Sequence, residues 1–253
     1  MSDRRAPAVR RWLGRRPAAA TALACTALAC AVLACAVLAL LAAGCQSVAA
    51  AASTAGAGSG GCHVVGGFKV CGPVYDRYAQ LGGPAGPLGN PLLDPRPAVG
   101  ADSVSYFQGG AVFATGTETD VHRVPGGEVP AVDVPSVYSL PLADFVVVRN
   151  ARAAGPSGIL VWTTDGCSGP TPPEVDDLFA DPCLRHDFGY RNFLNGPAVD
   201  PTGQRRLAID NQFLVDLRAT CVTAGQPQVN WLGVMMPCER AALLMYNAVR
   251  AFG

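Results

Sequence analysis

Apolar positions recur at helical spacing in the C-terminal third of the chain. Between Thr202 and about Thr223, the positions Leu207, Asp210, Leu214, Leu217 and Cys221 are separated by three, four, three and four residues. Residues at these spacings lie on one face of an α-helix, so the pattern predicts a helix over this stretch. The stripe is apolar except at Asp210, and the spacing therefore places a carboxylate in the core.

Two further helices are predicted on either side of this stretch. One follows Asp181-Pro182, a capping residue type before a proline that suits the first helical position, and is expected to span about 183–195. The other is expected to span 237–252. Together they predict a mainly α-helical domain over residues 138–253, built on disulfide-linked helices with an antiparallel pair at its centre.

Residues 62–128 follow a different pattern. Short β-branched or aromatic runs, such as Val104-Ser-Tyr-Phe and Ala111-Val-Phe, are separated by glycines, which predicts a small, turn-rich β module. Residues 46–61 are rich in Ala, Gly, Ser and Thr and predict a flexible linker. Residues 129–137, with two prolines among valines, predict a semi-rigid linker before the helical domain.

Residues 1–45 have the composition of an export segment. Six arginines lie within the first 16 residues, and the uncharged run 18–43 follows, long enough to span a bilayer with some tilt. Leu41-Ala-Ala-Gly-Cys45 resembles a bacterial lipobox, in which the cysteine is lipidated. Cleavage of a signal peptide near residues 49–55, or retention of the segment as an anchor, are the alternatives. Each outcome places the rest of the chain outside the cytoplasm.

The charge distribution excludes one class of partner. The formal net charge is zero over 253 residues, with 19 basic and 19 acidic side chains. Six of the basic residues and one of the acidic residues precede Cys45, so 13 basic and 18 acidic residues remain beyond it. A net charge of −5 there leaves no basic patch of the kind that binds nucleic acid.

The cysteine spacing agrees with an exported protein. Beyond the export segment, six cysteines allow fifteen disulfide pairings. They fall into three neighbouring couples, so the simplest prediction pairs Cys62 with Cys71, Cys167 with Cys183, and Cys221 with Cys238. Zinc binding is not expected, because no Cys-x-x-Cys pair or histidine partner accompanies these cysteines.

The candidate chemistry centres on the sequence Cys-Leu-Arg-His-Asp-Phe-Gly-Tyr over residues 183–190. His186 is the only histidine in the last half of the chain, so proton transfer near neutral pH is expected to depend on it. A buried carboxylate is costly unless it is paired, and this imidazole is the natural partner of Asp210. A histidine oriented in this way can act as a general base. Water is the expected nucleophile, because the chain has no Gly-x-Ser-x-Gly motif and the six cysteines are expected to be paired.

Two carboxylates are candidates for binding a cation. Asp187 directly follows the histidine, and Asp165 lies in the segment Thr164-Asp-Gly-Cys167, which a Cys167–Cys183 disulfide would draw towards the helix. Carboxylates and a loop carbonyl are hard oxygen ligands that suit Ca²⁺, which can polarise a substrate carbonyl. The alternative interpretation is a core histidine, a solvated helix aspartate and an ordinary turn aspartate.

These motifs resemble the secreted prokaryotic and fungal phospholipase A2 family over about residues 140–253. The resemblance rests on residues 164–167, 183–192 and 206–213, and on the last two cysteines. It implies that His186 is the catalytic base, that Asp210 orients it, and that Tyr190 lines the site. It also implies hydrolysis of the sn-2 ester of phospholipids. The implied Ca²⁺ ligands are Asp165, the carbonyl of Gly166, and Asp187.

A second resemblance covers about residues 70–127. The segments 78–91 (Tyr-Ala-Gln-Leu-Gly-Gly-Pro-Ala-Gly-Pro-Leu-Gly-Asn-Pro) and 106–113 (Tyr-Phe-Gln-Gly-Gly-Ala-Val-Phe) resemble one copy of the LGFP repeat. That repeat occurs in exported actinobacterial proteins and implies association with the cell wall. Asn90 stands where the repeat has its phenylalanine. The alternative is a turn-rich spacer without a ligand.

The sequence therefore predicts an exported or envelope-attached, monomeric, Ca²⁺-dependent phospholipase A2 that acts at membrane or micelle surfaces. The predicted products are a free fatty acid and a lysophospholipid, and residues 62–128 would bind a cell-wall ligand. The main alternative is a catalytically silent protein that binds lipid or cell wall on the same scaffold. A protein that acts chiefly as a wall adaptor through residues 62–128 is a third hypothesis.

Overall fold

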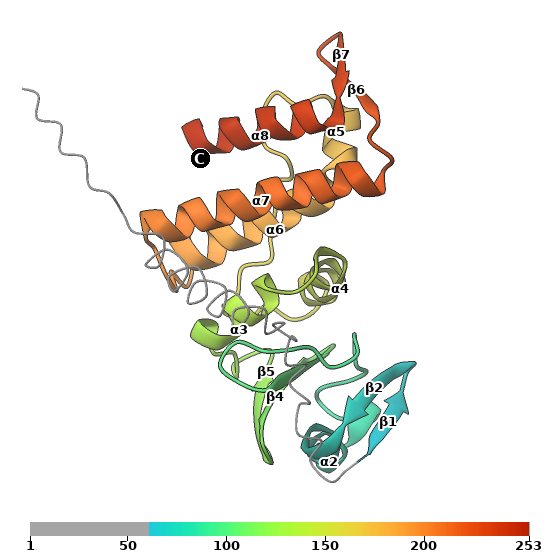
Figure 1. Cartoon of the computed structure of the whole chain (residues 1–253). Helices are drawn as coiled ribbons and strands as arrows, with labels where there is room; N and C mark the ends of the chain where they lie inside the picture. The colour runs from blue at the N-terminus through green and yellow to red at the C-terminus, as the bar shows by residue number, and fades with distance from the viewer. Residues whose placement is uncertain (1–60, 253) are drawn as a thin grey trace, which may run out of the picture. The chain divides into compact units, whose positions relative to one another are not determined.

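The computed structural model describes residues 61–252, which fall within one compact unit, Ser53–Gly253 (Figure 1). The predictions for the export segment, for lipidation of Cys45 and for the linker before Gly61 concern residues outside this range. Within residues 61–252, no helix has both the length and the apolar character needed to cross a membrane.

The first part of the described chain is rich in strands, as predicted. A hairpin of β1 (Cys62–Val65) and β2 (Phe68–Cys71) leads into α2 (Gly72–Gln80) and the short 3₁₀ helix η1 (Gly83–Ala85). An antiparallel sheet in the order β3-β4-β5 follows, with Val112 paired to both Ser105 and Val121. Its strands are β3 (Ser103–Phe107), β4 (Gly110–Thr115) and β5 (Glu118–Arg123).

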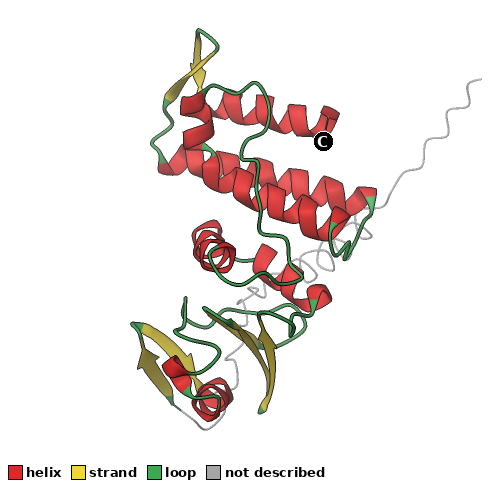
Figure 2. Ribbon diagram, turned by 180° about the vertical axis from the view of Figure 1, so that it is seen from behind, coloured by secondary structure: helices red, strands yellow, loops and turns green. Residues whose placement is uncertain are grey.

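The rest of the chain is mainly helical, which confirms the predicted fold class. In both views α7 extends alongside α6 on one side and α8 on the other, and the β6–β7 hairpin connects α7 to α8 at one end of the pair (Figures 1 and 2). The helices are α3 (Pro130–Tyr138), α4 (Leu142–Ala153), α5 (Pro173–Leu178), α6 (Ala180–Gly189), the π-helical turn η2 (Tyr190–Asn195), α7 (Gly203–Thr223) and α8 (Cys238–Phe252). The hairpin consists of β6 (Gln228–Trp231) and β7 (Val234–Pro237).

The three predicted helices are present, but the cap of the first differs from the prediction. The first helix begins at Ala180 with Phe179 as its N-cap, so Asp181 lies in the first turn, where its charge complements the helix dipole. The second helix is capped by Thr202, whose hydroxyl accepts a hydrogen bond from the Arg205 N–H at 3.1 Å. The hydroxyl of Thr202 also donates a hydrogen bond to the carboxylate of Asp200 at 2.8 Å.

The predicted apolar stripe of α7 is only partly correct. Asp210 is fully buried, as the spacing predicted, but the side chain of Leu207 is 41% exposed. Ile209 and Phe213 are buried instead, because α7 packs against two helices, α6 and α8, and its buried surface is wider than one stripe.

Residues 129–137, expected to form a semi-rigid linker, instead form most of α3. Pro130 occupies the first helical turn, where a missing N–H is harmless. Val134 and Val137 are buried in a core cluster that also includes residues of the β3–β5 sheet. The prolines suggested an extended segment, whereas burial of the valines favours the helix.

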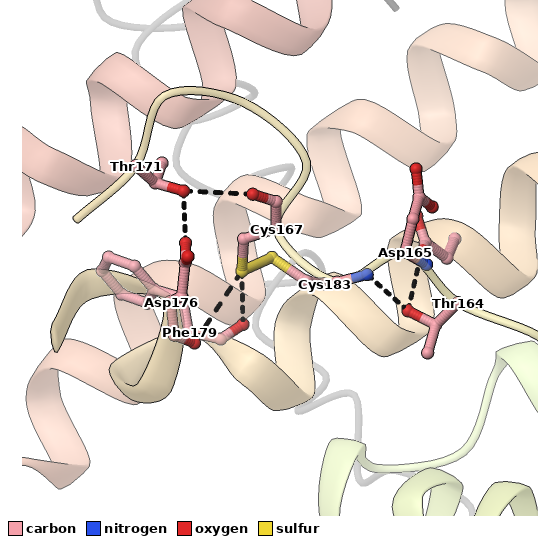
Figure 3. The surroundings of a disulfide bond; sticks show 9 residues. Thr164, Asp165, Cys167, Thr171, Asp176, Phe179 and Cys183 are labelled. Carbon is pink, nitrogen blue, oxygen red and sulfur yellow. Dashed lines mark hydrogen bonds between the residues drawn. A yellow bond between two sulfur atoms is a disulfide. The ribbon is translucent and has the colours of Figure 1, made fainter. Parts of the chain in front are cut away.

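The three predicted disulfides are all present. Cys62–Cys71 joins two paired positions of the first hairpin. Cys221–Cys238 joins the end of α7 to the start of α8, at the base of the β6–β7 hairpin. Cys167–Cys183 fastens the loop before α5 to α6, and the Thr171 hydroxyl donates a hydrogen bond to the Cys167 carbonyl at 3.1 Å (Figure 3).

A buried ion pair fixes the register of α6 against α7. The guanidinium of Arg185 donates two hydrogen bonds to the carboxylate of Asp216, and both side chains are more than nine-tenths buried. Arg185 also donates to the carbonyl of Leu140, before α4. Because Arg185 directly precedes His186, this pair holds the histidine at a fixed position along α7.

Candidate active site

His186 on α6 and Asp210 on α7 form a hydrogen-bonded pair. The distance from Nε2 of His186 to Oδ1 of Asp210 is 3.0 Å. The carboxylate is inaccessible to solvent, whereas 12% of the histidine side chain is exposed. The sequence therefore correctly predicted that these two residues meet in the helix pair.

Two other side chains hold the carboxylate of Asp210. The Tyr190 hydroxyl donates to Oδ1 at 2.8 Å, and the Arg250 guanidinium, from α8, donates to Oδ2 at 2.6 Å. Arg206 donates to the Tyr190 hydroxyl at 3.1 Å. The carboxylate is thus satisfied from three directions, which fixes its orientation towards the imidazole.

These contacts favour the ionised form of the Asp210 carboxylate. Burial raises the pKa of Asp210, but the hydrogen bonds from His186, Arg250 and Tyr190 outweigh burial and hold its pKa below the usual value. An ionised carboxylate only accepts hydrogen bonds, so Nε2 of His186 carries a proton. In the neutral ring Nδ1 then has a free lone pair, and it makes no hydrogen bond within residues 61–252. Such a nitrogen can accept a proton from a bound water.

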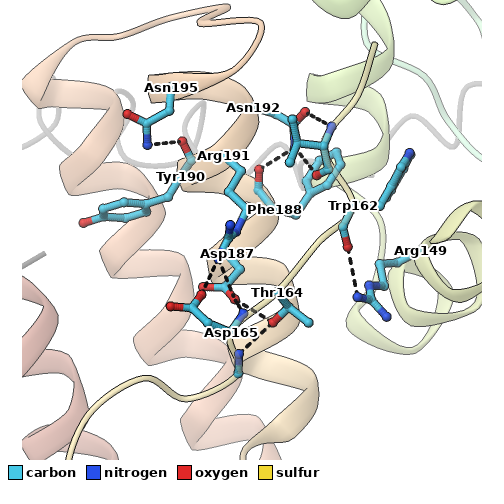
Figure 4. Close-up of polar contacts among 12 residues, drawn as sticks. Arg149, Trp162, Thr164, Asp165, Asp187, Phe188, Tyr190, Arg191, Asn192 and Asn195 are labelled. Atoms are coloured by element: carbon cyan, nitrogen blue, oxygen red, sulfur yellow. Dashed lines mark hydrogen bonds and ion pairs between the residues drawn. The ribbon is translucent and has the colours of Figure 1, made fainter. Parts of the chain in front are cut away.

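The neighbouring carboxylate, Asp187, accepts hydrogen bonds from the loop that the Cys167–Cys183 disulfide links to α6. Its Oδ2 accepts hydrogen bonds from the Thr164 hydroxyl at 2.6 Å and from the Asp165 N–H at 3.0 Å (Figure 4). The N–H of Gly166 in turn donates to the Thr164 hydroxyl at 2.9 Å. Gly166 has a φ of +72°, a left-handed conformation that glycine adopts without strain. The structure thus brings Asp165, Gly166 and Asp187 together, next to His186.

Arg191 lies beside both carboxylates of this group. Its guanidinium pairs with Asp165 and lies 4.0 Å from Oδ2 of Asp187 (Figure 4). Burial and the nearby charge of Asp165 raise the pKa of Asp187, despite its bonds from Thr164 and the loop. The pKa of Asp165 is lowered, because its hydrogen bonds with Asp187 and Arg191 outweigh its slight burial. One guanidinium therefore only partly neutralises the two carboxylates.

Three arginines make contacts with the carboxylates of this site that the sequence did not predict. Arg206 precedes Asp210 by four residues and Arg191 follows Asp187 by four, a spacing that places each pair on one helix face. That signal was present in the sequence. Arg250 lies 40 residues after Asp210, and no local pattern connects the two. Only the need of a buried carboxylate for a positive partner pointed to such a residue.

Comparison with known proteins gives consistent matches. Residues 135–253 match the family model described as prokaryotic phospholipase A2. The chain is 30% identical over 117 residues to a secretory phospholipase A2 of Beauveria bassiana (strain ARSEF 2860), covering 46% of this chain and 55% of the relative. It is 34% identical over 119 residues to a secretory phospholipase A2 of Arthroderma benhamiae (strain ATCC MYA-4681 / CBS 112371), covering 46% of this chain and 74% of the relative. The chain thus spans about half the length of the first relative and about three quarters of the second.

Proposed function

The chain belongs to the phospholipase A2 family, and from this premise we propose that it hydrolyses the sn-2 ester of phospholipids in a Ca²⁺-dependent reaction. The products are a free fatty acid and a lysophospholipid. The observation that carries the proposal is the buried Asp210 carboxylate, 3.0 Å from Nε2 of His186, whose Nδ1 makes no hydrogen bond to the described residues.

In the proposed reaction, Nδ1 of His186 accepts a proton from water as the water oxygen bonds to the sn-2 carbonyl carbon. Asp210 stays ionised and stabilises the imidazolium that forms. When the bond between the acyl carbon and the glycerol oxygen breaks, the imidazolium returns the proton to that oxygen. Tyr190 and Arg250 keep the carboxylate oriented throughout, since both hydrogen-bond to it.

We propose that Ca²⁺ is held by carboxylate oxygens of Asp165 and Asp187 and by the Gly166 carbonyl. The donor set fits a hard cation, because it consists only of oxygens and includes two incompletely neutralised carboxylates. Among residues 61–252 there is no group of three or more His, Cys, Asp or Glu that could hold a metal, so the set depends on the backbone carbonyl. When bound, the ion supplies a Lewis acid for the ester carbonyl.

The reaction is tested with a phosphatidylcholine that carries different labels on its two acyl chains. The protein is the unit 53–253, because Arg152 of α4 donates hydrogen bonds to the carbonyls of Gln108 and Gly110 and so ties the helices to the sheet. We expect release of the sn-2 fatty acid alone, in the presence of Ca²⁺ and not of a chelator. No release from folded, disulfide-bonded protein would contradict the proposal and favour the silent lipid- or wall-binding alternative.

Replacement of Arg250 by leucine is expected to lower kcat about tenfold with little change in KM. The magnitude is taken by analogy from metal sites, where the loss of a residue that orients a ligand typically costs about 10- to 100-fold. The reason is that Asp210 would lose its bond at Oδ2 and hold the imidazole less firmly. Steady-state kinetics on phosphatidylcholine vesicles measure both constants. Arg250→Lys should recover most of kcat, because it restores a positive donor. Equal losses in the lysine and leucine variants would contradict a positioning role.

Attachment to the envelope is a separate proposal that rests on the sequence. We propose that residues 62–128 bind a cell-wall ligand, on the resemblance to the LGFP repeat, and that Cys45 is a lipidation site. The module is in contact with the helices: Nδ1 of the buried His122 lies 2.8 Å from Asp133 of α3, and Arg96 pairs with Asp144 of α4 at 2.7 Å. These contacts mean that a wall ligand bound by the module would also localise the helical domain.

A further inference from the structure

The β6–β7 hairpin exposes large apolar side chains at its tip. The exposed fractions are 71% for Leu232, 59% for Val234 and 61% for Met235. The hairpin segment, Gln-Val-Asn-Trp-Leu-Gly-Val-Met-Met-Pro over residues 228–237, contains no charged residue. Both views show the hairpin projecting from one end of the α7–α8 pair (Figures 1 and 2).

The base of this hairpin is firmly held. Val229 and Met236, which are paired across the strands, are buried in a core cluster that also contains the Cys221–Cys238 disulfide. The N–H of Asn230 donates to the Glu174 carboxylate of α5 at 2.5 Å. The apolar tip is therefore carried on an anchored support.

The backbone of the tip is unusual for an apolar side chain. Leu232 and Gly233 form the two-residue turn with φ angles of +52° and +90°. Asn, Asp or Gly is the ordinary choice at the first of these positions, because a leucine side chain is strained there. The N–H of Gly233 is satisfied by the Asn230 side chain at 2.7 Å, and the strands pair up to the turn. A leucine held in this conformation suggests a use for the side chain.

We propose that the hairpin tip inserts into the surface of a phospholipid bilayer, with Leu232, Val234 and Met235 in the acyl region. The half-buried Trp231, directly before the turn, suits the boundary between apolar and wet surroundings. Attraction to anionic lipid is not the driving force, because the chain beyond Cys45 has a net charge of −5. The hairpin proposal rests on the proposed function, because it assumes that the substrate lies in a phospholipid surface.

The hairpin is connected to the site through α5. The bond between Asn230 and Glu174 joins β6 to α5, and α5 follows the loop that contains Cys167 and the carboxylate Asp165. The two helices that flank the hairpin are α7, which carries Asp210, and α8, which carries Arg250. Insertion of the tip would therefore hold these elements at the lipid surface while substrate enters.

The test uses the unit 53–253, which contains the three disulfides and the three apolar clusters of the described chain and can be expected to fold alone. It also omits the uncharged run 18–43, which would itself bind vesicles. The variant is Leu232→Glu. The matched control is Val64→Glu on β1, where the native side chain is equally exposed, at 72%.

Two substrates separate surface binding from chemistry. On vesicles of palmitoyl-oleoyl phosphatidylcholine, Leu232→Glu is expected to lower turnover at least about tenfold, because a charge at the tip opposes insertion. On a short-chain phosphatidylcholine dissolved as monomers, turnover should stay within about twofold of the wild type. Val64→Glu should change neither rate. Equal effects of Leu232→Glu on both substrates, or no effect on vesicles, would overturn the proposal.

Vesicle flotation separates this proposal from the proposed function. All proteins in this experiment carry His186→Ala, so that binding is measured without hydrolysis. The His186→Ala protein should float with the vesicles, and the protein that also carries Leu232→Glu should not. If the wild type hydrolyses neither substrate, the proposed function fails, while flotation lost only in the Leu232→Glu variant still supports the hairpin. Flotation that Leu232→Glu leaves unchanged overturns the hairpin proposal alone. If the protein forms a dimer without lipid and Leu232→Glu dissociates that dimer, the partner of the hairpin is a second copy of the chain. This result would also overturn the hairpin proposal.

Discussion

Replacement of His186 by alanine is expected to lower kcat by roughly 10²- to 10⁴-fold, the usual contribution of a positioned general base. His186 is the only histidine of the α6–α7 pair, and no side chain or backbone group in the described part of the chain is hydrogen-bonded to its Nδ1. The fold should persist, because Asp210 keeps its bonds from Tyr190 and Arg250 when the imidazole is removed. Initial rates on phosphatidylcholine vesicles, together with thermal unfolding of both proteins, measure the two effects.

His63 offers a matched control for this variant. It is an exposed histidine that stacks on Tyr75, with ring centroids 3.6 Å apart, in the β-rich part of the chain. His63→Ala should leave kcat unchanged within about twofold, since a surface substitution of this kind is usually mild. Turnover of His186→Ala close to that of the wild type would exclude the histidine as the base.

Replacement of Asp187 by asparagine should raise the Ca²⁺ concentration for half-maximal activity by at least about 10- to 100-fold, the loss found even for outer-shell partners of metals. The asparagine oxygen can still accept the Thr164 hydroxyl bond, so the loop should keep its shape while the site loses one negative charge. Rates measured against buffered free Ca²⁺ give the midpoint. Calorimetric titration of the His186→Ala protein with Ca²⁺ gives the affinity without turnover.

Arg191→Gln is expected to change the Ca²⁺ midpoint in the opposite direction. Arg191 pairs with Asp165, one of the proposed ligands, so the guanidinium and Ca²⁺ compete for one carboxylate. Removal of the positive charge should therefore lower the Ca²⁺ midpoint, in the direction opposite to Asp187→Asn. An unchanged midpoint in Asp187→Asn would remove that residue from the ligand set, whatever Arg191→Gln does.

The pairing at the centre of the site could be predicted from the sequence because it depends on local spacing. Asp210 interrupts an apolar stripe, and one imidazole is available on a neighbouring helix. The Cys167–Cys183 prediction likewise depended only on separation along the chain, and it places the loop beside α6. Local periodicity and a count of histidines were sufficient for these features.

Tertiary packing decided the features that could not be predicted. Leu207 fits the period of α7, yet neighbouring helices bury Ile209 instead, and only their positions determine which face is covered. Residues 130–138 contain two prolines, and buried valines outweigh the low helix propensity of those prolines. Arg250 reaches Asp210 from a helix that is remote in sequence. Each case depends on a partner that the local sequence does not contain.

If Asp165 and Asp187 bind Ca²⁺ as proposed, the Cys167–Cys183 disulfide should make hydrolysis depend on the compartment in which the chain folds. It spans 16 positions of sequence, and a closure of this size contributes about 3 kcal/mol in the chain-entropy model. In the reducing cytoplasm these thiols stay apart, and the segment with Asp165 is not fastened to the helix with Asp187. We therefore expect newly synthesised chains to be inert towards the lipids of the producing cell. Formation of the disulfide after export would then confine hydrolysis to the compartment outside the cytoplasm.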